Sequence, residues 1–514
     1  MRKCERCGQV LSRYNTEPVC ASCAHAPALR PAVDRAAEEW LSRSGLATGL
    51  HDHEAGNALR AYRLAAGLSQ ASLASMLGMT QQNLSQIEGG RAASMEQRQR
   101  IVEVLGLAPE DLGLASQPPP ELGGRGSRDV AESRARWRAE RRWLNQHRNE
   151  LARLAAQLYP DDWRVPGTPL LAHPSWTVAE PIALRSIGLE LDESPHAVTV
   201  DGSEPAAAPV RPLRASNAPF DRYTAAIKHL DPPRLFESRP SYRILSADLG
   251  DRRLRFGMAA YFDKLDVSEA LGHETAIACM RHRSGMPTAD QLGGRLPFRE
   301  LIGDPFIADR RAIIPAITTL TIRLRRHPSP PAFLLHWRDP ARVATAGGTY
   351  DVIPAGEFQP SSVALWDRHS DFDLWRNIVR EYAEELLGAP EHDGTRSAPI
   401  DYDAWPLYRE LDRAFADGTL SAHVLGLGLD ALTLAATILT VVVIDDDVFE
   451  QTFGDVVHYN DEGEIVAIGG NRSAEGVPFN RDAVERLLTS EPMASPGAAC
   501  LALAWRHRSQ LLGV

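Results

Sequence analysis

The sequence lacks any apolar run long enough to cross a membrane. The longest one, residues 431–444, has 14 residues between Asp430 and Asp445, whereas a spanning helix needs ~20. We interpret this run as a buried strand or core helix and expect no membrane partner. The first residues, Met-Arg-Lys-Cys, also lack the apolar segment of a secretory signal, which favours a cytoplasmic protein.

Cysteine is scarce as well, with 6 residues in a chain of 514. So low a content excludes a secreted scaffold built on disulfides. Cys279 and Cys500 stand alone in the sequence, and we expect them to be core thiols rather than nucleophiles.

The other four cysteines form two C-x2-C pairs, Cys4 with Cys7 and Cys20 with Cys23. Four thiolates at this spacing match the tetrahedral coordination of a closed, structural zinc site. The alternative, two disulfides, does not suit a reducing cytoplasm. We therefore expect residues 1–27 to form a zinc-ribbon-like motif, similar to small ribbons that contact DNA or protein.

The chain as a whole has no surplus of basic residues, since its net charge is −11. This argues against a general polyanion binder. The charge is unevenly placed, because residues 1–158 hold 21 Lys and Arg against 17 Asp and Glu, whereas the remainder holds 35 against 50. A mildly basic head on an acidic body fits a DNA-binding head attached to a region with another task.

Residues 68–90 carry the pattern of two short helices joined by a tight turn. Ser69 and Thr80 are N-cap candidates, and Gly78 suits the left-handed end of the first helix. Apolar residues at helical spacing would bury both helices: Leu73, Ala74, Leu77, Leu84 and Ile87. The second helix then points four polar side chains outward: Gln81, Gln82, Ser85 and Gln86.

An exposed helix lined with amides suits base reading, because glutamine can pair bidentately with adenine in the major groove. The segment, above all Thr-Gln-Gln-Asn-Leu-Ser-Gln-Ile-Glu-Gly-Gly-Arg91, resembles the Cro/repressor (XRE) helix-turn-helix family over about fifty residues. The resemblance implies phosphate contact at Gln70, base contacts on the second helix and a backbone contact at Arg91. The expected DNA-contacting set is Gln70, Thr80, Gln81, Gln82, Ser85 and Arg91. The alternative is a helical bundle whose amides only solvate its surface.

Composition divides the rest of the chain. We place the helix-turn-helix domain at residues 55–115 and a Pro- and Gly-rich linker at 116–129. Residues 130–160 predict an Arg-rich connecting helix, whose packing stripe would be Trp137, Leu144, Leu151 and Leu154. Its arginines either contact phosphate or pair with nearby acids, namely Glu132, Glu140 and Glu150. Residues 161–312 are a mixed α/β region of unknown role, in which a helix is expected to begin at 272–274.

Residues 313–514 predict strands at 317–324, 332–337, 350–354, 424–429 and 437–444, and closing helices at 480–488 and 496–505. Between them, residues 374–388 predict a helix that ends at a glycine. Glu381, Glu384 and Glu385 share one face of this helix. Clustered carboxylates repel one another unless a cation neutralises them, and Mg²⁺ takes such oxygens together with substrate phosphates.

The run Arg-Glu-Tyr-Ala-Glu-Glu-Leu-Leu-Gly388 resembles the second half of the Nudix box, R-E-x-x-E-E-x-x-G, and the preceding Pro-Ala-Gly-Glu357 turn suits that fold. The resemblance implies that Glu381, Glu384 and Glu385 hold Mg²⁺ and a nucleoside-diphosphate-linked ligand. The first half of the box departs from the family, since Phe372 replaces its Glu, Trp366 replaces its Gly, and residues 360–373 look like an insertion. We therefore expect poor water activation. The alternative is a helix with a solvated acidic face.

We thus expect a multidomain protein: an all-α helix-turn-helix head with a small zinc knuckle, followed by an α+β, Nudix-like domain at residues 313–514. The favoured function is a sequence-specific, DNA-binding transcriptional regulator. It would act as a homodimer, with a C-terminal region that senses a nucleotide-like ligand or a partner, and with no catalytic residues. The alternative is a Nudix-type hydrolase that carries a DNA-binding head. A stress or phage-defence module that regulates its own operon stays open.

Overall fold

The structure is a computed structural model. It describes Arg63, residues 69–88, Gln97, Ile101 and residues 125–513 with gaps at 234–235, 283–284, 326–328, 339–347, 390–397, 455–462 and 467–475. Contacts divide these residues between two units, one within 19–127 and one from 128 onward. The expected zinc-ribbon-like motif, with Cys4, Cys7, Cys20 and Cys23, lies outside the described residues, as does Arg91.

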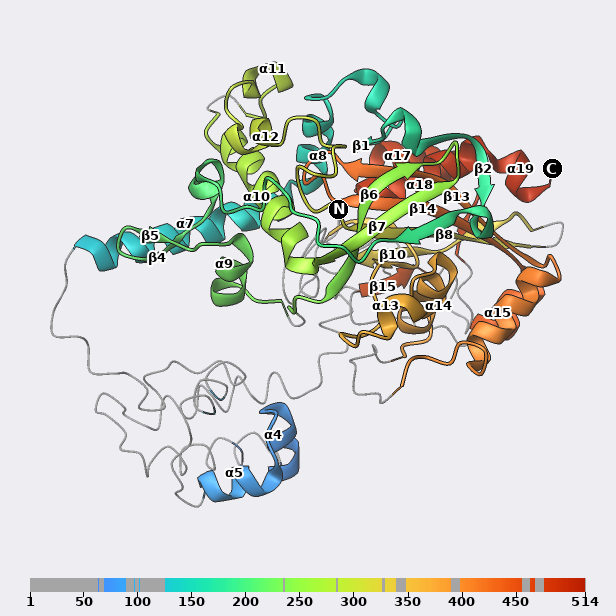
Figure 1. The fold of residues 1–514 in the computed structure, drawn as a ribbon, viewed down its shortest axis with the longest axis horizontal. Helices are drawn as coiled ribbons and strands as arrows, with labels where there is room; N and C mark the ends of the chain where they lie inside the picture. Colours follow the sequence, from blue (N-terminus) through green and yellow to red (C-terminus); the bar gives the residue numbers. More distant parts are fainter. Residues whose placement is uncertain are drawn as a thin grey trace. The chain divides into compact units, whose positions relative to one another are not determined.

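In the first unit, two short helices form around a glycine turn (Figure 1). Helix α4 (Gln70–Met76) is followed by Gly78 with φ of +61° and then by α5 (Gln81–Glu88). The Thr80 hydroxyl accepts the Asn83 N–H at 3.2 Å, so Thr80 caps α5 as expected. The five apolar residues expected to bury these helices are all at most 3 % exposed: Leu73, Ala74, Leu77, Leu84 and Ile87.

The second unit is an α+β region built on a curled sheet of eight strands. Its order is β1 (Leu170–Leu171), β13 (Leu420–Asp430), β14 (Ala436–Asp445), β8 (Pro315–Leu324), β9 (Ala332–Phe333) and β16 (Val477–Pro478), with β2 (Thr177–Ala183) on β13 and β12 (Ala355–Glu357) on β8. Strands β14 and β8 run parallel, and the other pairs are antiparallel. Because β1 and β2 pair with β13, the sheet takes strands from both sides of residue 313.

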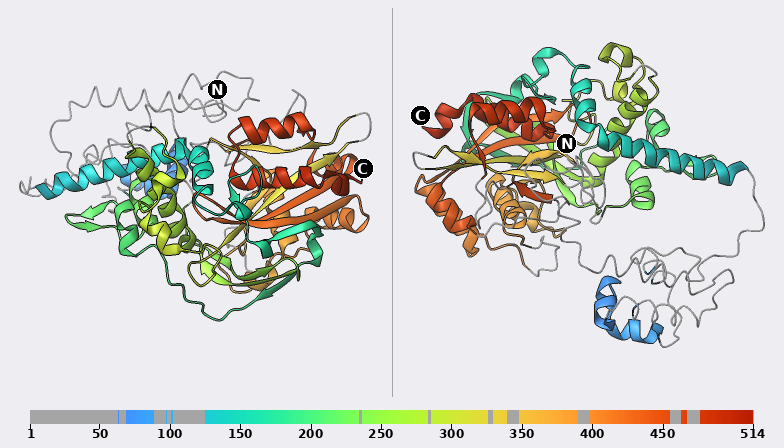
Figure 2. Two further views of the ribbon diagram at one scale, coloured as in Figure 1. Left: turned by 90° about the horizontal axis from the view of Figure 1, so that it is seen from above. Right: turned by 180° about the vertical axis from the view of Figure 1, so that it is seen from behind.

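The central strand β14 shows why the sheet is covered on both faces. Ile438 and Val442 belong to one hydrophobic core, whereas Leu439 and Val441 belong to the other, as the twofold alternation of a strand requires. Helix α18 (Ser495–Arg506) packs on one face, next to α17 (Arg481–Ser490). Helices α14 (Leu374–Glu385), α15 (Pro406–Ala416) and α16 (Asp446–Phe453) pack on the opposite side (Figures 1 and 2).

Three smaller sheets and several short elements complete this unit. The sheets are β11 (Tyr350–Val352), β10 (Leu335–Arg338) and β15 (Gly463–Val466); β3 (Gly188–Leu191), β7 (Arg253–Ala260) and β6 (Pro240–Asp248); and β4 (Leu213–Ala215) with β5 (Ala218–Pro219). The shorter α-helices are α9 (Tyr223–Leu230), α11 (Ala289–Leu292), α12 (Pro297–Ile302), α13 (Asp367–Ser370) and α19 (Arg508–Leu512). The 3-10 helices are η2 (Asp161–Trp163), η3 (Pro174–Trp176), η4 (Leu184–Ser186) and η5 (Pro205–Val210).

Helix α10 (Tyr261–Met280) is the buried helix of the region. It contacts α8 (Arg148–Ala156), α9, α12 and η5, and all its residues from Lys264 to Cys279 are buried. The expectation that a helix begins at 272–274 is wrong, because those residues lie inside α10. The sequence did not show where α10 starts, because a helix that is buried on all sides has no separate apolar face to mark its first turn.

The expected connecting helix is present as α7 (Arg125–Gln146) and α8, and its predicted packing stripe is confirmed by the burial of Trp137, Leu144, Leu151 and Leu154. The partners expected for its arginines are largely wrong. Of the three proposed acids, only Glu140 contacts an arginine of this helix in a resolved ion pair, with Arg136 at 3.8 Å. Other arginines of this helix contact residues that are distant in sequence, because their side chains face the core or half-buried backbone.

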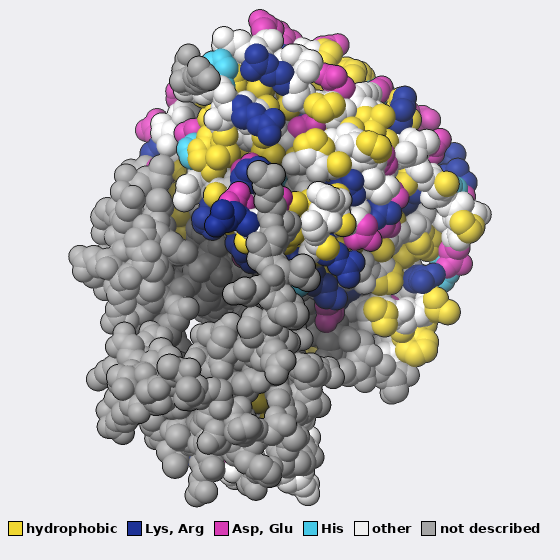
Figure 3. Space-filling view, turned by 90° about the vertical axis from the view of Figure 1, so that its left-hand side faces the viewer, with side chains coloured by type: hydrophobic (Ala, Val, Ile, Leu, Met, Phe, Trp, Pro, Cys, Tyr) yellow, Lys and Arg dark blue, Asp and Glu magenta, His cyan; other side chains and the backbone are white. Residues whose placement is uncertain are grey.

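Two of these arginines bind backbone carbonyls: Arg134 donates to Leu213 O and Arg138 to Leu230 O. Arg136 and Arg142 are exposed. Figure 3 views the region from the side on which α7 begins, and its coloured basic side chains lie scattered among acidic and apolar ones.

Cys279 and Cys500 are buried free thiols, which confirms their expected place in the core. Within the parts of the chain that are described, no helix is long and apolar enough to cross a membrane. The longest apolar run forms β14 and the turn before it.

Candidate functional site

Helix α5 presents a row of polar side chains on a fixed support. Gln81, Gln82 and Ser85 are exposed, whereas Leu84 and Ile87 on the opposite side are 0 and 3 % exposed. The hydrophobic side fixes the rotation of the helix, and the Thr80 cap fixes its start. The polar side chains are thus displayed together from a helix that cannot turn them inward.

Gln70 is placed differently from the other expected DNA-contacting residues. Its amide nitrogen donates to Glu88 Oε2 at 2.8 Å. The same carboxylate accepts from Arg63 Nε at 2.6 Å and from Arg63 Nη2 at 3.0 Å. Glu88 is 6 % exposed, so this three-residue network ties the start of α4 to the end of α5.

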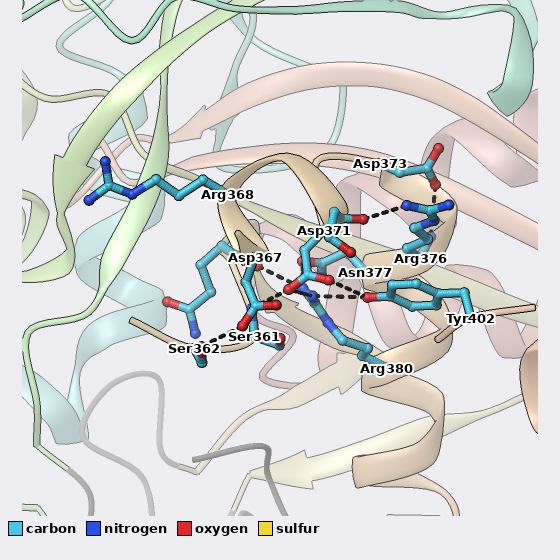
Figure 4. Close-up of polar contacts among 12 residues, drawn as sticks. Ser361, Ser362, Asp367, Arg368, Asp371, Asp373, Arg376, Asn377, Arg380 and Tyr402 are labelled. Carbon is cyan, nitrogen blue, oxygen red and sulfur yellow. Dashed lines mark hydrogen bonds and ion pairs between the residues drawn. The ribbon is translucent and has the colours of Figure 1, made fainter. Parts of the chain in front are cut away.

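A second polar cluster joins the start of α14 to the loop before it (Figure 4). Arg380 Nη1 lies 3.0 Å from Asp371 Oδ2, and Asp371 is fully buried. Asp371 also accepts the Tyr402 hydroxyl at 2.7 Å and the Ser361 N–H at 2.7 Å. Burial raises the pKa of the Tyr402 phenol, and the adjacent Asp371 carboxylate raises it further, so the phenol stays a donor.

This cluster changes how the incomplete box is understood. Phe372 points into an aromatic group with Tyr242, Phe256 and Phe358. The carboxylate opposite Arg380 comes instead from Asp371, one residue earlier. An acid therefore does face Arg380, because residues 360–373 fold back onto α14 and bring Asp371 to it.

The carboxylates of α14 lie against strand β12. Glu381 fills the space in which a side chain at position 356 would stand, so Gly356 is required there. Glu385 is 7 % exposed and accepts the Ala355 N–H at 3.2 Å. Both acids thus help to fix β12 on the helix. The helix ends at Glu385, three residues before the expected end at Gly388, and Gly388 has a left-handed φ of +66°.

The fit of these residues to Mg²⁺ can be judged from this geometry. Among the residues that the structure describes, no three His, Cys, Asp or Glu side chains are grouped so that they could hold a metal ion. Since Glu381 packs on Gly356 and Glu385 accepts the Ala355 N–H, the described arrangement does not fit a bound ion.

On the other face of β12 lies a cavity of about 260 Å³. Lys264 from α10 forms an ion pair with Glu357 at its wall, and their side chains are 9 and 20 % exposed. Arg148 from α8 and Glu269 from α10 form a second ion pair there, at 3.1 Å. The end of β12 therefore separates the acidic helix from a cavity lined by charged pairs.

Residues 54–114 match the family model of a helix-turn-helix domain. The matched segment holds α4, the glycine turn and α5. The head is a helix-turn-helix domain. No curated protein matches the chain.

For the helix-turn-helix domain, the sequence correctly predicted which polar residues are exposed on α5. Thr80, Gln81, Gln82 and Ser85 come together at the start and exposed side of α5, whereas Gln70 turns toward Glu88. For the second region, sequence reasoning missed Asp371 and Lys264. Asp371 carried a signal, since it stands next to the position where the Nudix box needs an acid. Lys264 carried none, because its partner Glu357 is distant in sequence.

Proposed function

We propose that the protein is a sequence-specific, DNA-binding transcriptional regulator whose α+β region senses a small ligand. The observation that carries the proposal is the exposed row on α5, held by a buried core and a cap within a helix-turn-helix domain. Amides on such a helix can read adenine edges in the major groove. The protein would act in the cytoplasm as a homodimer on two half-sites.

Selection of bound DNA from a random pool, using the full chain, tests this proposal. Recovery of a shared motif is the expected result, and recovery of unenriched DNA at low salt would contradict sequence-specific reading. A variant with Arg142→Ala provides a control, because that arginine is exposed on α7 and should leave the selected motif unchanged.

Two finer parts of the proposal concern metals. Cys4, Cys7, Cys20 and Cys23 would hold one structural zinc per chain, as their paired spacing favours. Glu381, Glu384 and Glu385 would bind Mg²⁺ with a nucleotide-like, diphosphate-containing ligand in a Nudix-like fold. Because their described positions do not suit an ion, this second site requires rotation of their side chains on binding.

The alternative function is a Nudix-type hydrolase of a nucleoside-diphosphate-linked substrate with a DNA-binding head. The buried Arg380–Asp371 pair favours it, since it supplies an acid opposite the arginine that the sequence pattern lacked. Steady hydrolysis of such a substrate by the wild-type chain, abolished in Glu385→Gln, would establish the enzyme over the sensor. Unchanged DNA binding without turnover would reject it.

A further inference from the structure

The cavity beside β12 has buried hydrogen-bond acceptors in its wall that a ligand could satisfy. At about 260 Å³ it lies just below the roughly 300–1,000 Å³ of common small-molecule sites. Its wall combines α8, α10, β12 and the loop before α18. It lies on the side of β12 that carries Glu357, whereas Gly356 faces Glu381, so it is separate from the acidic face of α14.

The hydrogen bonding of its wall leaves acceptors without donors. Glu357 Oε1 accepts from Lys264, but Glu357 Oε2 is buried with no partner. Asn149 donates through its amide nitrogen to Met493 O at 3.2 Å, which leaves its buried Oδ1 without a partner. A buried acceptor that lacks a donor is costly, so a group that donates to both oxygens would be favoured.

The charges of the wall point to the kind of donor. Three cationic side chains line the cavity (Arg148, Lys264 and Arg338), against four carboxylates (Glu269, Glu357, Asp351 and Asp430). The lining therefore carries one excess negative charge. An ammonium group would neutralise it and donate to Glu357 Oε2, whereas a phosphate would add to it.

The same cavity is joined by polar contacts to helix α7. Glu269 lies 3.1 Å from Arg148 at the wall and 3.5 Å from Arg141 of α7, and its side chain is 3 % exposed. Arg141 in turn donates to the Tyr223 hydroxyl at 3.3 Å. A movement of Glu269 toward the cavity would therefore separate the charge of Arg141 from its buried partner.

The contacts continue to a second residue of α7. The Tyr223 hydroxyl lies 2.8 Å from His273 Nδ1, and His273 Nε2 lies 3.1 Å from Glu140 Oε2. Burial lowers the pKa of His273, which keeps the ring neutral, with Nδ1 accepting and Nε2 donating. Helix α7 begins at Arg125, inside the segment expected as the linker at 116–129, so it is the element of this region next to the head in sequence.

We infer that this cavity binds a small cationic amine, with the ammonium group at Glu357 Oε2 and Asn149 Oδ1, and that its occupancy is transmitted to α7 through Glu269. The inference rests on the proposed regulatory function but names a ligand class and a site that differ from the acidic helix.

Calorimetric titration of the full chain with putrescine, agmatine and ethanolamine, without DNA or Mg²⁺, tests the binding site. At least one amine should bind saturably, and Glu357→Gln should weaken that binding at least tenfold. Glu150→Gln, the same change at an exposed position of α8, should have no effect. Lys264→Met combined with Glu357→Gln avoids an unpaired lysine and should still not bind. Binding of ribose or inorganic phosphate in place of the amines, or equal amine binding to Glu357→Gln, would overturn the assignment.

The transmission step has its own readout, the affinity of the full chain for its selected DNA with and without the bound amine. The wild type should show a change within the ~5–150-fold range of allosteric coupling. Arg141→Met, a change outside the cavity wall, should still bind the amine but lose this change in DNA affinity, whereas a retained response or a loss of amine binding would overturn the transmission through Glu269. DNA binding in the absence of amine tests the regulator proposal separately, so failure of one does not imply failure of the other.

Discussion

Asp371 and Arg380 form a buried ion pair, with Asp371 Oδ2 and Arg380 Nη1 3.0 Å apart and side chains 0 and 5 % exposed. It joins the loop after β12 to the helix that carries the acidic face. Arg380 further donates to Gln359 O at 2.7 Å and to Asn377 Oδ1 at 2.9 Å. Because the guanidinium is engaged by all of these groups, the pair fixes how residues 359–373 lie on α14.

Removing one member of this pair should be strongly destabilising. Asp371→Ala would leave the Arg380 charge buried without its acid, at a cost of ~3–5 kcal/mol in the free energy of unfolding. Urea unfolding of the α+β region measures it, with Asp403→Ala at an exposed position as the control. Asp371→Leu combined with Arg380→Met should recover much of the loss. A loss below about 1 kcal/mol in Asp371→Ala would contradict a structural role for the pair.

The sequence predicted the regular elements better than the contacts between them. Strand alternation and buried apolar runs located β8, β13 and β14, and N-cap and glycine signals located α5 and α14, because these signals are local. The ion pair of Lys264 with Glu357 joins residues 93 positions apart, and nothing in the pattern of either segment encodes that approach. Long-range pairing depends on how the layers pack, which periodicity does not specify.

The arginines of α7 illustrate the same limit. Their number predicted a polar helix, but Arg141 faces Glu269 in the core while Arg142 beside it is exposed. A difference of one position on a helix changes the facing direction by about 100°, so the burial of a single arginine depends on the neighbour it meets. The apolar stripe through Trp137 was predictable because several residues repeat it.

The stability of the α+β region should fall as the pH rises through the titration of Asp266. Burial raises the pKa of this carboxyl to about 6 from its ordinary value of 3.8. Between these values the folded chain holds a proton that the unfolded chain has lost, so the stabilisation present below pH ~4 disappears above pH ~6. Relative to Asp266→Asn, the wild type should lose up to ~3 kcal/mol from pH 4 to pH 7.

Urea unfolding of both proteins across this pH range provides the measurement for Asp266. The variant should keep the hydrogen bond that Asp266 accepts from the Thr224 N–H at 2.7 Å, because an amide oxygen can accept it too. Asp403→Asn controls for the general effect of removing a carboxylate. Parallel pH profiles for wild type and Asp266→Asn would show that Asp266 ionises normally.

Zinc should be present at one ion per chain in protein purified under reducing conditions, bound by Cys4, Cys7, Cys20 and Cys23. Elemental analysis combined with thiol titration measures it. Cys20→Ser should lose the zinc, whereas Cys279→Ser should retain it, since Cys279 is a buried free thiol. Metal-free protein with four freely titrating N-terminal thiols would reject the site.

The residues of the helix-turn-helix domain should separate base reading from phosphate binding. Gln81→Ala and Gln82→Ala should relax base preference, at ~1–3 kcal/mol of discrimination per lost bidentate contact. Arg91→Ala should weaken binding to all sequences and reduce the salt slope by about one phosphate contact. Fluorescence titrations at several salt concentrations distinguish the two. Glutamine variants that keep full sequence preference would show that α5 does not read the bases.

A nucleoside-diphosphate compound should stabilise the folded chain only when Mg²⁺ is present, if the acidic face of α14 is a ligand site. Binding to the folded state alone raises the free energy of unfolding by RT ln(1 + [L]/Kd), or ~2.7 kcal/mol at a hundredfold excess over Kd. The variant Glu384→Gln/Glu385→Gln should lose this shift while keeping its fold, because an amide oxygen in place of the Glu385 carboxylate can still accept the Ala355 N–H. Thermal unfolding with a panel of such compounds is the measurement, and Glu150→Gln is the matched control. A wild type that shows no Mg²⁺-dependent shift would reject the ligand site and leave Glu381 and Glu385 with the single role of holding β12 on the helix.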